Sequence, residues 1–153
     1  MCGPGYQCPP GSSARIPASC DEGTYLISDD ASDHASADQC SSCTAGYYLN
    51  SSTYACIACE RGKYAATSGS TSCKICEAGK DAPTNKTTEC TKCEAGSYLS
   101  DGGTAALLHD EVTDCTVCTA GTFIAEEASA GPCVNCTKGR FLRDPALDVS
   151  KHD

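Results

Sequence analysis

Residues 40–93 read CSSCTAGYYLNSSTYACIACERGKYAATSGSTSCKICEAGKDAPTNKTTECTKC. The motif Cys-x-x-Cys occurs four times in this stretch, and two further copies follow it along the chain. The six pairs are Cys40/Cys43, Cys56/Cys59, Cys73/Cys76, Cys90/Cys93, Cys115/Cys118 and Cys133/Cys136. Repetition of one short unit at a nearly fixed period is typical of a tandem array, in which each unit is a small supersecondary structure.

A glycine and an aromatic residue follow the pairs at constant spacing. The glycine stands three positions after the second cysteine, at Gly46, Gly62, Gly79, Gly96, Gly121 and Gly139. Two positions later stands an aromatic residue, at Tyr48, Tyr64, Tyr98, Phe123 and Phe141, whereas one repeat carries Asp81 there. The repeating unit is therefore Cys-x-x-Cys-x-x-Gly-x-aromatic followed by a variable polar loop.

The repeat divides the chain into three parts. Residues 1–39 follow the pattern loosely, because Cys2, Cys8 and Cys20 each precede a glycine by three positions but open no Cys-x-x-Cys pair. Residues 40–139 carry the tandem repeats, and residues 140–153 form a polar tail or the start of a further repeat. The short apolar and aromatic pieces that follow the glycines predict short strands, with glycine supplying the turns. Helix is hardly indicated, apart from one or two turns within 102–109.

The apolar content is too low for an ordinary core. Leu, Ile, Val and Phe make up 18 of the 153 residues, whereas cysteine alone supplies 15. A chain so poor in large apolar side chains cannot offset the entropy lost on ordering by burial alone. Cysteine at this density is typical of disulfide-rich extracellular proteins. We therefore expect a small disulfide-rich fold without a large hydrophobic core.

The three asparagines point to the same compartment. Asn50, Asn85 and Asn135 are each followed two positions later by Ser or Thr, which makes all three N-glycosylation acceptors by sequence. Asn135 is the weakest of them, since Cys136 lies beside it. We therefore expect a secreted or cell-surface glycoprotein.

Charge and hydropathy narrow the possible partners. The net charge of −9 disfavours nucleic acid and anionic membranes, which require clustered Lys and Arg. No apolar run is long enough to be a secretory signal or a membrane span, so we expect no membrane insertion in this segment. The remaining partners are other copies of the chain, arranged head to tail or laterally, or another extracellular protein.

Loop closure favours one pairing of the cysteines. A bond within Cys-x-x-Cys closes a very small ring, whereas a bond from the second cysteine of one pair to the first of the next closes a loop. Loops of about 13 to 22 residues are each stabilised by roughly 3 kcal/mol in the chain-entropy model. The expected bridges are Cys2–Cys8, Cys20–Cys40, Cys43–Cys56, Cys59–Cys73, Cys76–Cys90, Cys93–Cys115 and Cys118–Cys133. Cys136 is left unpaired, or pairs with another chain.

We call each disulfide-closed loop a box. The expected box has an aromatic lid over its own disulfide and contacts only the adjacent boxes, which predicts an elongated array of short β-hairpin and loop modules. In this arrangement Tyr25, Tyr48, Tyr64 and Tyr98 cover sulfur. Tyr47 and Tyr54 lie outside the lid position and are the better candidates for contact with a partner or a glycan.

With its repeats laid out, the chain resembles the cysteine-rich modules of ephrin-receptor-like and growth-factor-receptor-like ectodomains. It is similar also to tumour-necrosis-factor-receptor repeats and to surface-coat proteins of single-celled eukaryotes. The residues that carry the resemblance run from Cys40 to Phe141. The resemblance implies sequential disulfide pairing and an extracellular rod, and it supplies no active site.

Other chemistries for these residues are less favoured. Cys-x-x-Cys pairs also bind zinc in intracellular zinc ribbons, and a single such pair serves thioredoxin-like enzymes. The acidic residues 29–33 match no calcium-binding loop, so we expect no Ca²⁺ site. The histidines His34, His109 and His152 stand alone in polar loops, which indicates solvated surface positions.

We recognise no nucleophile, acid–base pair or cofactor-binding loop, and we predict neither an enzyme nor a bound cofactor. The favoured hypothesis is an extracellular structural glycoprotein, a disulfide-laddered rod within a surface coat, appendage or filament. The first alternative is a receptor or adhesion ectodomain that binds another protein, and the second is an intracellular zinc-binding module.

Overall fold

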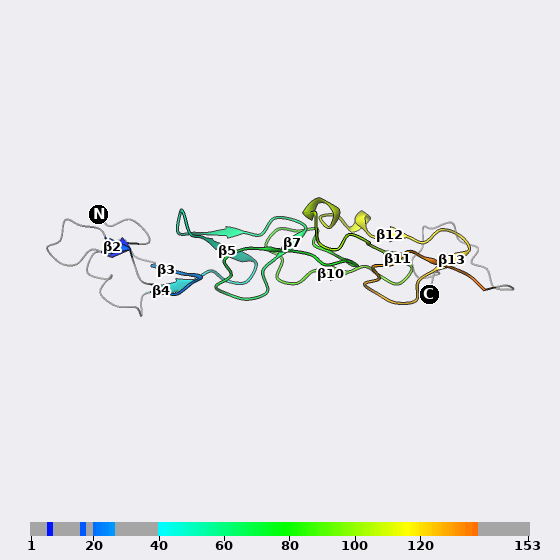
Figure 1. Ribbon diagram of the computed structural model, residues 1–153, viewed down its shortest axis with the longest axis horizontal. Coiled ribbons are helices and arrows are strands. Elements are labelled where there is room, and N and C mark those ends of the chain that lie inside the picture. Colours follow the sequence, from blue (N-terminus) through cyan, green and yellow to red (C-terminus); the bar gives the residue numbers. More distant parts are fainter. Residues whose placement is uncertain (1–5, 8–15, 18–19, 27–39, 138–153) are drawn as a thin grey trace. The chain divides into compact units, whose positions relative to one another are not determined.

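The computed structural model describes residues 6–7, 16–17, 20–26 and 40–137 (Figure 1). Its strands are short and pair in sequence order into seven two-stranded antiparallel sheets within these residues. The hairpins are β1 (Tyr6–Gln7) with β2 (Ile16–Pro17), β3 (Thr24–Leu26) with β4 (Cys40–Ser42), β5 (Tyr47–Asn50) with β6 (Ala55–Ala58), β7 (Lys63–Tyr64) with β8 (Lys74–Ile75), β9 (Lys80–Asp81) with β10 (Thr91–Lys92), β11 (Ser97–Tyr98) with β12 (Thr116–Val117), and β13 (Thr122–Phe123) with β14 (Val134–Asn135). Helix within the described residues is limited to two 3₁₀ turns, η2 (Ala106–Leu108) and η3 (Val112–Asp114).

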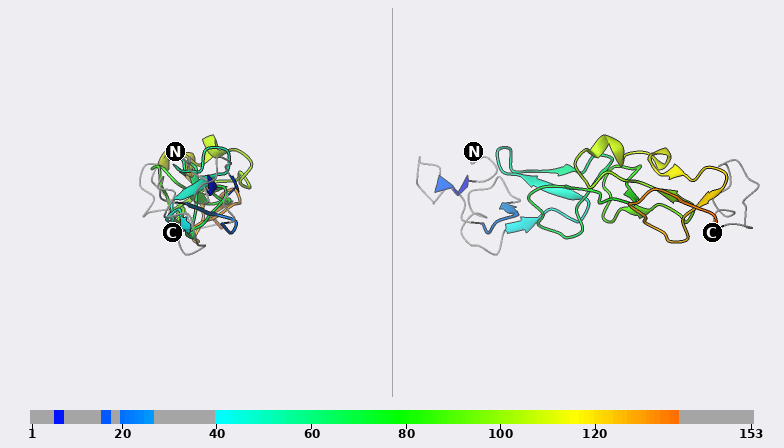
Figure 2. Two further views of the ribbon diagram at one scale, coloured as in Figure 1. Left: turned by 90° about the vertical axis from the view of Figure 1, so that its left-hand side faces the viewer. Right: turned by 45° about the vertical axis from the view of Figure 1, so that its right-hand side comes forward.

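Contacts between Cα atoms divide the chain into two compact units. The first comprises Met1–Cys59 and Ala65–Cys73, and the second comprises Glu60–Tyr64 and Lys74–Asp153. Within each unit the hairpins follow one another in chain order, as the colours of Figure 2 show. The sequence-based division at residues 39 and 139 falls within or beside segments outside the described residues, so it stays a prediction.

A disulfide closes each of the six boxes between Cys20 and Cys133. The structure forms Cys20–Cys40, Cys43–Cys56, Cys59–Cys73, Cys76–Cys90, Cys93–Cys115 and Cys118–Cys133, with Cα atoms 5.5–5.9 Å apart. These are the six pairs that loop closure predicted for this part of the chain. The seventh expected bridge, Cys2–Cys8, lies outside the described residues.

One backbone pattern explains why the repeat needs its glycine. Gly79 has φ of +74°, a left-handed conformation that other residues rarely adopt. This turn lets Lys80 N–H donate to the Glu77 carbonyl at 3.2 Å, and the Gly79 carbonyl accepts from Cys93 N–H at 2.8 Å. The same three features recur at the equivalent positions of the neighbouring repeats, with Gly46, Gly62 and Gly96 at φ between +76° and +84°.

Adjacent boxes are joined by a second recurring hydrogen bond. The glycine N–H of one box donates to the carbonyl of the residue after the aromatic position in the next box. The four bonds of this kind are Gly46 to Ala65, Gly62 to Ala82, Gly79 to Leu99 and Gly96 to Ile124, all at 2.8–2.9 Å. The repeat sequence therefore specifies both the box and its attachment to the next one.

The boxes also contact beyond their immediate neighbours, which corrects the expectation that each touches only adjacent ones. A Cβ added at Gly79 would collide with the carbonyl of Ala128, which lies two boxes further along. Gly62 is covered in the same way by Ala106, and Gly23 by Gly69. The variable loops fold back over the glycines of earlier boxes. The backbone of each loop occupies the space that a side chain at the glycine would need.

The interior consists largely of sulfur. Of the eleven buried hydrophobic residues in the described part, six are half-cystines, at positions 43, 59, 76, 90, 93 and 118. The remaining five are Leu49, Ala65, Ala82, Leu99 and Ile124. Leu49, Leu99 and Ile124 are the large aliphatic residues among them, which confirms a small disulfide-rich fold without a large hydrophobic core.

Tyr64 shows that an aromatic lid can reach a neighbouring box. Its ring belongs to the 59–73 box, yet it packs against Cys76, Ala82 and Cys90 of the following box. The ring of Tyr64 therefore covers the next disulfide, Cys76–Cys90. The residue has this reach because the Gly62–Ala82 hydrogen bond holds the two boxes together.

Candidate functional site

The longest described insertion in the repeats lies between Leu99 and Cys115, and it carries most of the unusual side chains. We call residues 101–114 the insertion. Its first turn is built on Asp101, whose carboxylate accepts hydrogen bonds from the backbone of Gly103, Thr104 and Ala105 at 2.8–3.2 Å and from the Thr104 hydroxyl. An Asx turn of this kind orders a loop locally.

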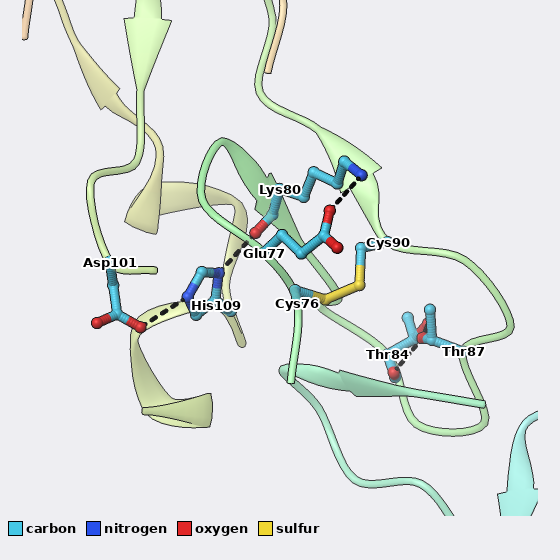
Figure 3. Close-up of a disulfide and its surroundings, with 8 residues drawn as sticks. All are labelled: Cys76, Glu77, Lys80, Thr84, Thr87, Cys90, Asp101 and His109. Atoms are coloured by element: carbon cyan, nitrogen blue, oxygen red, sulfur yellow. Dashed lines mark hydrogen bonds and ion pairs between the residues drawn. A yellow bond between two sulfur atoms is a disulfide. The ribbon is translucent and has the colours of Figure 1, made fainter. Parts of the chain in front are cut away.

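His109 anchors the insertion and lies fully buried, so the prediction of a solvated histidine is wrong. Its Nδ1 lies 2.7 Å from the Lys80 carbonyl and its Nε2 lies 3.0 Å from Asp101 Oδ2 (Figure 3). Both partners are acceptors, so both ring nitrogens donate only when the imidazole is cationic. His34 and His152 lie outside the described residues.

The hydrogen bonds at Asp101 determine its electrostatics. The bond from the Thr104 hydroxyl, followed by the bond from His109, lowers the pKa of Asp101 well below its usual range. These donors stabilise the ionised carboxylate, because hydrogen bonds to a charged form favour that form. Asp101 is therefore a structural anion that holds the start of the insertion and the ring of His109 together.

Further contacts attach the insertion to earlier boxes of the same unit. Ala82 N–H donates to the His109 carbonyl at 2.7 Å. Arg61 lies 3.7 Å from the Asp110 carboxylate and 3.9 Å from that of Glu111. A capping box between Glu111 and Asp114 caps the N-terminus of η3. The insertion is thus held at several points along its length.

This anchored insertion exposes apolar side chains. Leu107 is 80% exposed, Val112 67% and Leu108 50%, and these are three of the five exposed large hydrophobic residues in the described part of the chain. Ordered residues that present apolar surface are common at protein interfaces. The sequence predicted one or two helical turns within 102–109, but nothing in it indicated that a buried histidine would hold them in place.

Asp81 is the second unusual residue, and the sequence identified it as the departure from the aromatic position. It is 2% exposed, and its Oδ2 has no hydrogen-bond partner among the described residues. Desolvation raises the pKa of Asp81, and the nearby Asp114 carboxylate raises it further, while its own backbone N–H and His109 act in the opposite direction. A buried and incompletely bonded carboxylate is costly, so its presence calls for a reason.

The predicted acceptor asparagines are accessible to different degrees. Asn85 and Asn135 are exposed, whereas Asn50 is half-buried. The Asn50 side chain accepts from Ser52 and Thr53 backbone N–H at 2.9 and 3.3 Å, and Asn85 Oδ1 accepts from Arg61 N–H at 3.1 Å. Glycan occupancy at all three stays a prediction.

The remaining residues singled out from the sequence are two tyrosines, one cysteine and an acidic segment. Tyr47 and Tyr54 are half-buried, and each takes part in contacts within the chain. Cys136 is half-buried, donates its N–H to the Gly121 carbonyl at 2.9 Å, and forms no disulfide with any described cysteine. The acidic residues 29–33 lie outside the described residues. Within the described ranges, no helix has the length and apolar character needed to cross a membrane.

Comparison with known proteins finds one family to which part of the chain is similar. Residues 46–88 match the family described as tyrosine-protein kinase ephrin type A/B receptor-like. No curated protein matches the chain. The match spans the box closed by Cys59–Cys73 and most of the boxes closed by Cys43–Cys56 and Cys76–Cys90, and it includes Asp81, the departure from the aromatic position. Residues 46–88 are therefore similar to an ephrin-receptor-like cysteine-rich module, and disulfides at this density are typical of extracellular domains.

Proposed function

We propose that the chain is an extracellular structural glycoprotein, a disulfide-laddered rod within a surface coat, appendage or filament. The observation that carries this proposal is the joint between boxes, which recurs at Gly46, Gly62, Gly79 and Gly96 with the same backbone hydrogen bond. Backbone joints of this kind place few demands on side chains, so the loops can vary while the spacing is kept. Such an array suits a protein whose task is to hold a distance.

Cys136 offers a means of assembly. It has the spacing of a cysteine that would bridge to a further box, and it is left unpaired among the described residues. A disulfide from Cys136 to Cys2 or Cys8 of another copy, formed in place of the Cys2–Cys8 bridge, would join chains head to tail, because a contact between unlike surfaces that does not close gives a filament. The N-linked glycans expected at Asn85 and Asn135 would then lie along the assembly.

The experiment is to secrete the full chain from a eukaryotic host and to measure its mass in solution with and without reductant. We expect disulfide-linked oligomers that Cys136→Ser abolishes, and filaments in negative-stain images of the native protein. Thr137→Ser is the matched control, because it alters the neighbouring residue and keeps the thiol. A monomer with one alkylatable thiol, and no association at high concentration, would reject assembly through Cys136.

A receptor or adhesion ectodomain is the second candidate, and the exposed Leu107, Leu108 and Val112 favour it. A monomer that binds a separate protein through the insertion would support this alternative. Replacement of Leu107 and Val112 by Ser would then reduce binding without altering oligomeric state. The two hypotheses are distinguished because the first depends on Cys136 and the second on the insertion.

A further inference from the structure

A cavity lies where the repeat pattern loses its aromatic residue. In the earlier repeat, Tyr64 stands two positions after Gly62 and packs on the disulfide Cys76–Cys90 of the next box. Asp81 stands two positions after Gly79, and the next disulfide is Cys93–Cys115. By the same geometry, Asp81 occupies the place from which a ring would cover Cys93–Cys115.

The structure contains a cavity of about 560 Å³ at this place, lined by both half-cystines and by Asp81. Pro83, Val112 and Val117 contribute apolar walls. A carboxylate is much shorter than a phenol ring, so the substitution leaves the space over the disulfide open. The cavity is therefore a consequence of one residue in an otherwise regular repeat.

The charges around the cavity favour a cation. Asp81 is buried with an unpartnered Oδ2, and Glu94 also lines the cavity. The one basic residue among the lining residues, Lys92, is paired with Glu127 at 3.5 Å. Burial raises the pKa of Asp81 and Asp114 adds to this effect, so a bound cation would relieve an electrostatic cost that the folded protein carries.

We propose that this cavity binds a lysine side chain of a partner protein. The ammonium group donates to the Asp81 carboxylate, and the four-carbon stem lies along Val112, Val117 and the Cys93–Cys115 disulfide. Because Oδ2 is buried, Asp81 must rotate about χ2 to meet the ammonium, and this torsion is soft for a carboxylate. The proposal does not depend on the structural role above, since it concerns one box and needs no assembly.

The test compares two peptides by NMR on the intact, oxidised protein. Acetyl-Gly-Lys-Gly-amide is titrated against the ¹⁵N-labelled chain, and acetyl-Gly-norleucine-Gly-amide serves as the neutral control of similar shape. We expect the lysine peptide to shift the resonances of Asp81, Val112 and Val117. The norleucine peptide should bind at least about tenfold more weakly than the lysine peptide. Equal shifts by the two peptides, or no shifts with either, would overturn the proposal.

Two variants separate charge from shape. Asp81→Asn keeps the cavity and removes the charge, and it should weaken the lysine peptide by about tenfold. Asp81→Tyr restores the ring of the repeat, fills the cavity and should abolish binding, while the free energy of unfolding is unchanged or increased. Binding of the lysine peptide to Asp81→Tyr as strongly as to the wild type would show that the site lies elsewhere.

A third measurement uses the wild-type protein, so it remains available if either Asp81 variant fails to fold. The pKa of Asp81 can be followed by its carboxyl ¹³C shift in the wild-type protein. We expect this pKa to fall when the lysine peptide is present and to stay constant with the norleucine peptide. A pKa that does not respond to the lysine peptide would contradict direct contact.

Discussion

Gly79 shows how much one residue of the repeat contributes. Its φ of +74° lies in the region that disfavours side chains, and the carbonyl of Ala128 occupies the space of its missing Cβ. The sequence predicted a turn at each such glycine, because Gly stands three positions after the second cysteine of every pair. It could not predict the second requirement, since the loop that covers Gly79 comes almost fifty residues later, with no signal linking the two.

Gly79→Ala is expected to destabilise the protein. A left-handed alanine costs about 1–2 kcal/mol, and displacement of the Ala128 backbone adds to this, so we expect a loss of at least about 2 kcal/mol in the free energy of unfolding. Denaturant unfolding of the oxidised protein measures it. Gly102→Ala is the matched control, because nothing lies within 4 Å of its added Cβ, and it should change stability by less than about 0.5 kcal/mol. Equal stability of the two variants would show that the Ala128 loop yields to the methyl group.

His109 is the residue that sequence reasoning misjudged. A lone histidine in a polar loop is usually solvated, and that general expectation failed because the ring meets one acceptor from Asp101 and one from the Lys80 backbone. The Asp101 signal was nevertheless in the sequence. Asp-Gly-Gly-Thr is typical of an Asx turn. Such a turn fixes the direction of the backbone that follows it.

At the scale of elements, the hairpins were predictable and the insertion was not. Cys-x-x-Gly fixes the turn, the next two residues form the strand, and the disulfide brings back its partner, so a strand pair such as β9 with β10 follows from local sequence. The insertion is held by contacts with residues about 20 to 50 positions away, namely Lys80, Ala82 and Arg61. Its position therefore depends on tertiary contacts, which a single sequence does not reveal.

The order of the insertion should depend on pH. The pKa of Asp101 is lower in the folded chain than its unfolded value of about 3.9. A carboxylate with a depressed pKa stabilises the fold above the unfolded pKa, and this contribution is lost as pH falls toward the folded pKa. We therefore expect the backbone amides of Gly103, Thr104 and Ala105 to lose hydrogen-exchange protection below about pH 4.

Two variants test the source of that dependence. Asp101→Asn should remove the pH dependence of protection, whereas Asp110→Asn, which makes the same charge change in the same insertion, should retain it. Amide exchange corrected for intrinsic rates is the measurement. Protection in the wild type that stays constant through the acid range would show that Asp101 does not hold the turn.

At the scale of the whole molecule, covalent bonds replace the missing interior. The pairing of successive boxes was predictable because it closes loops of useful length where a bond within Cys-x-x-Cys does not, and the six described bridges join these cysteines. The order in which rings and sulfur meet was not predictable. Tyr64 covers the disulfide of the following box, because the hydrogen bond from Gly62 to Ala82 holds the two boxes together.

The thiol content of the intact protein tests this description. Six described disulfides and the expected Cys2–Cys8 bridge leave Cys136 as the single free thiol of the 15 cysteines. Alkylation of the denatured, non-reduced protein should therefore add no more than one group per chain, whether the chain is monomeric or linked through Cys136, as measured by mass spectrometry. Reduction should unfold the protein, because each bridge contributes roughly 3 kcal/mol. Bound zinc together with most cysteines titratable would instead support the intracellular zinc-binding alternative.

The bridges from Cys20 to Cys133 also determine how the chain would carry a pulling force. Tension applied beyond the two ends of the ladder passes through each S–S bond and then through the two residues that separate it from the next bond. The 13 to 22 positions spanned by each bridge stay outside this load path, so they cannot be drawn straight while the sulfur bonds last. An oxidised chain should therefore stretch very little under load, and a reducing agent would release the stored length one box at a time.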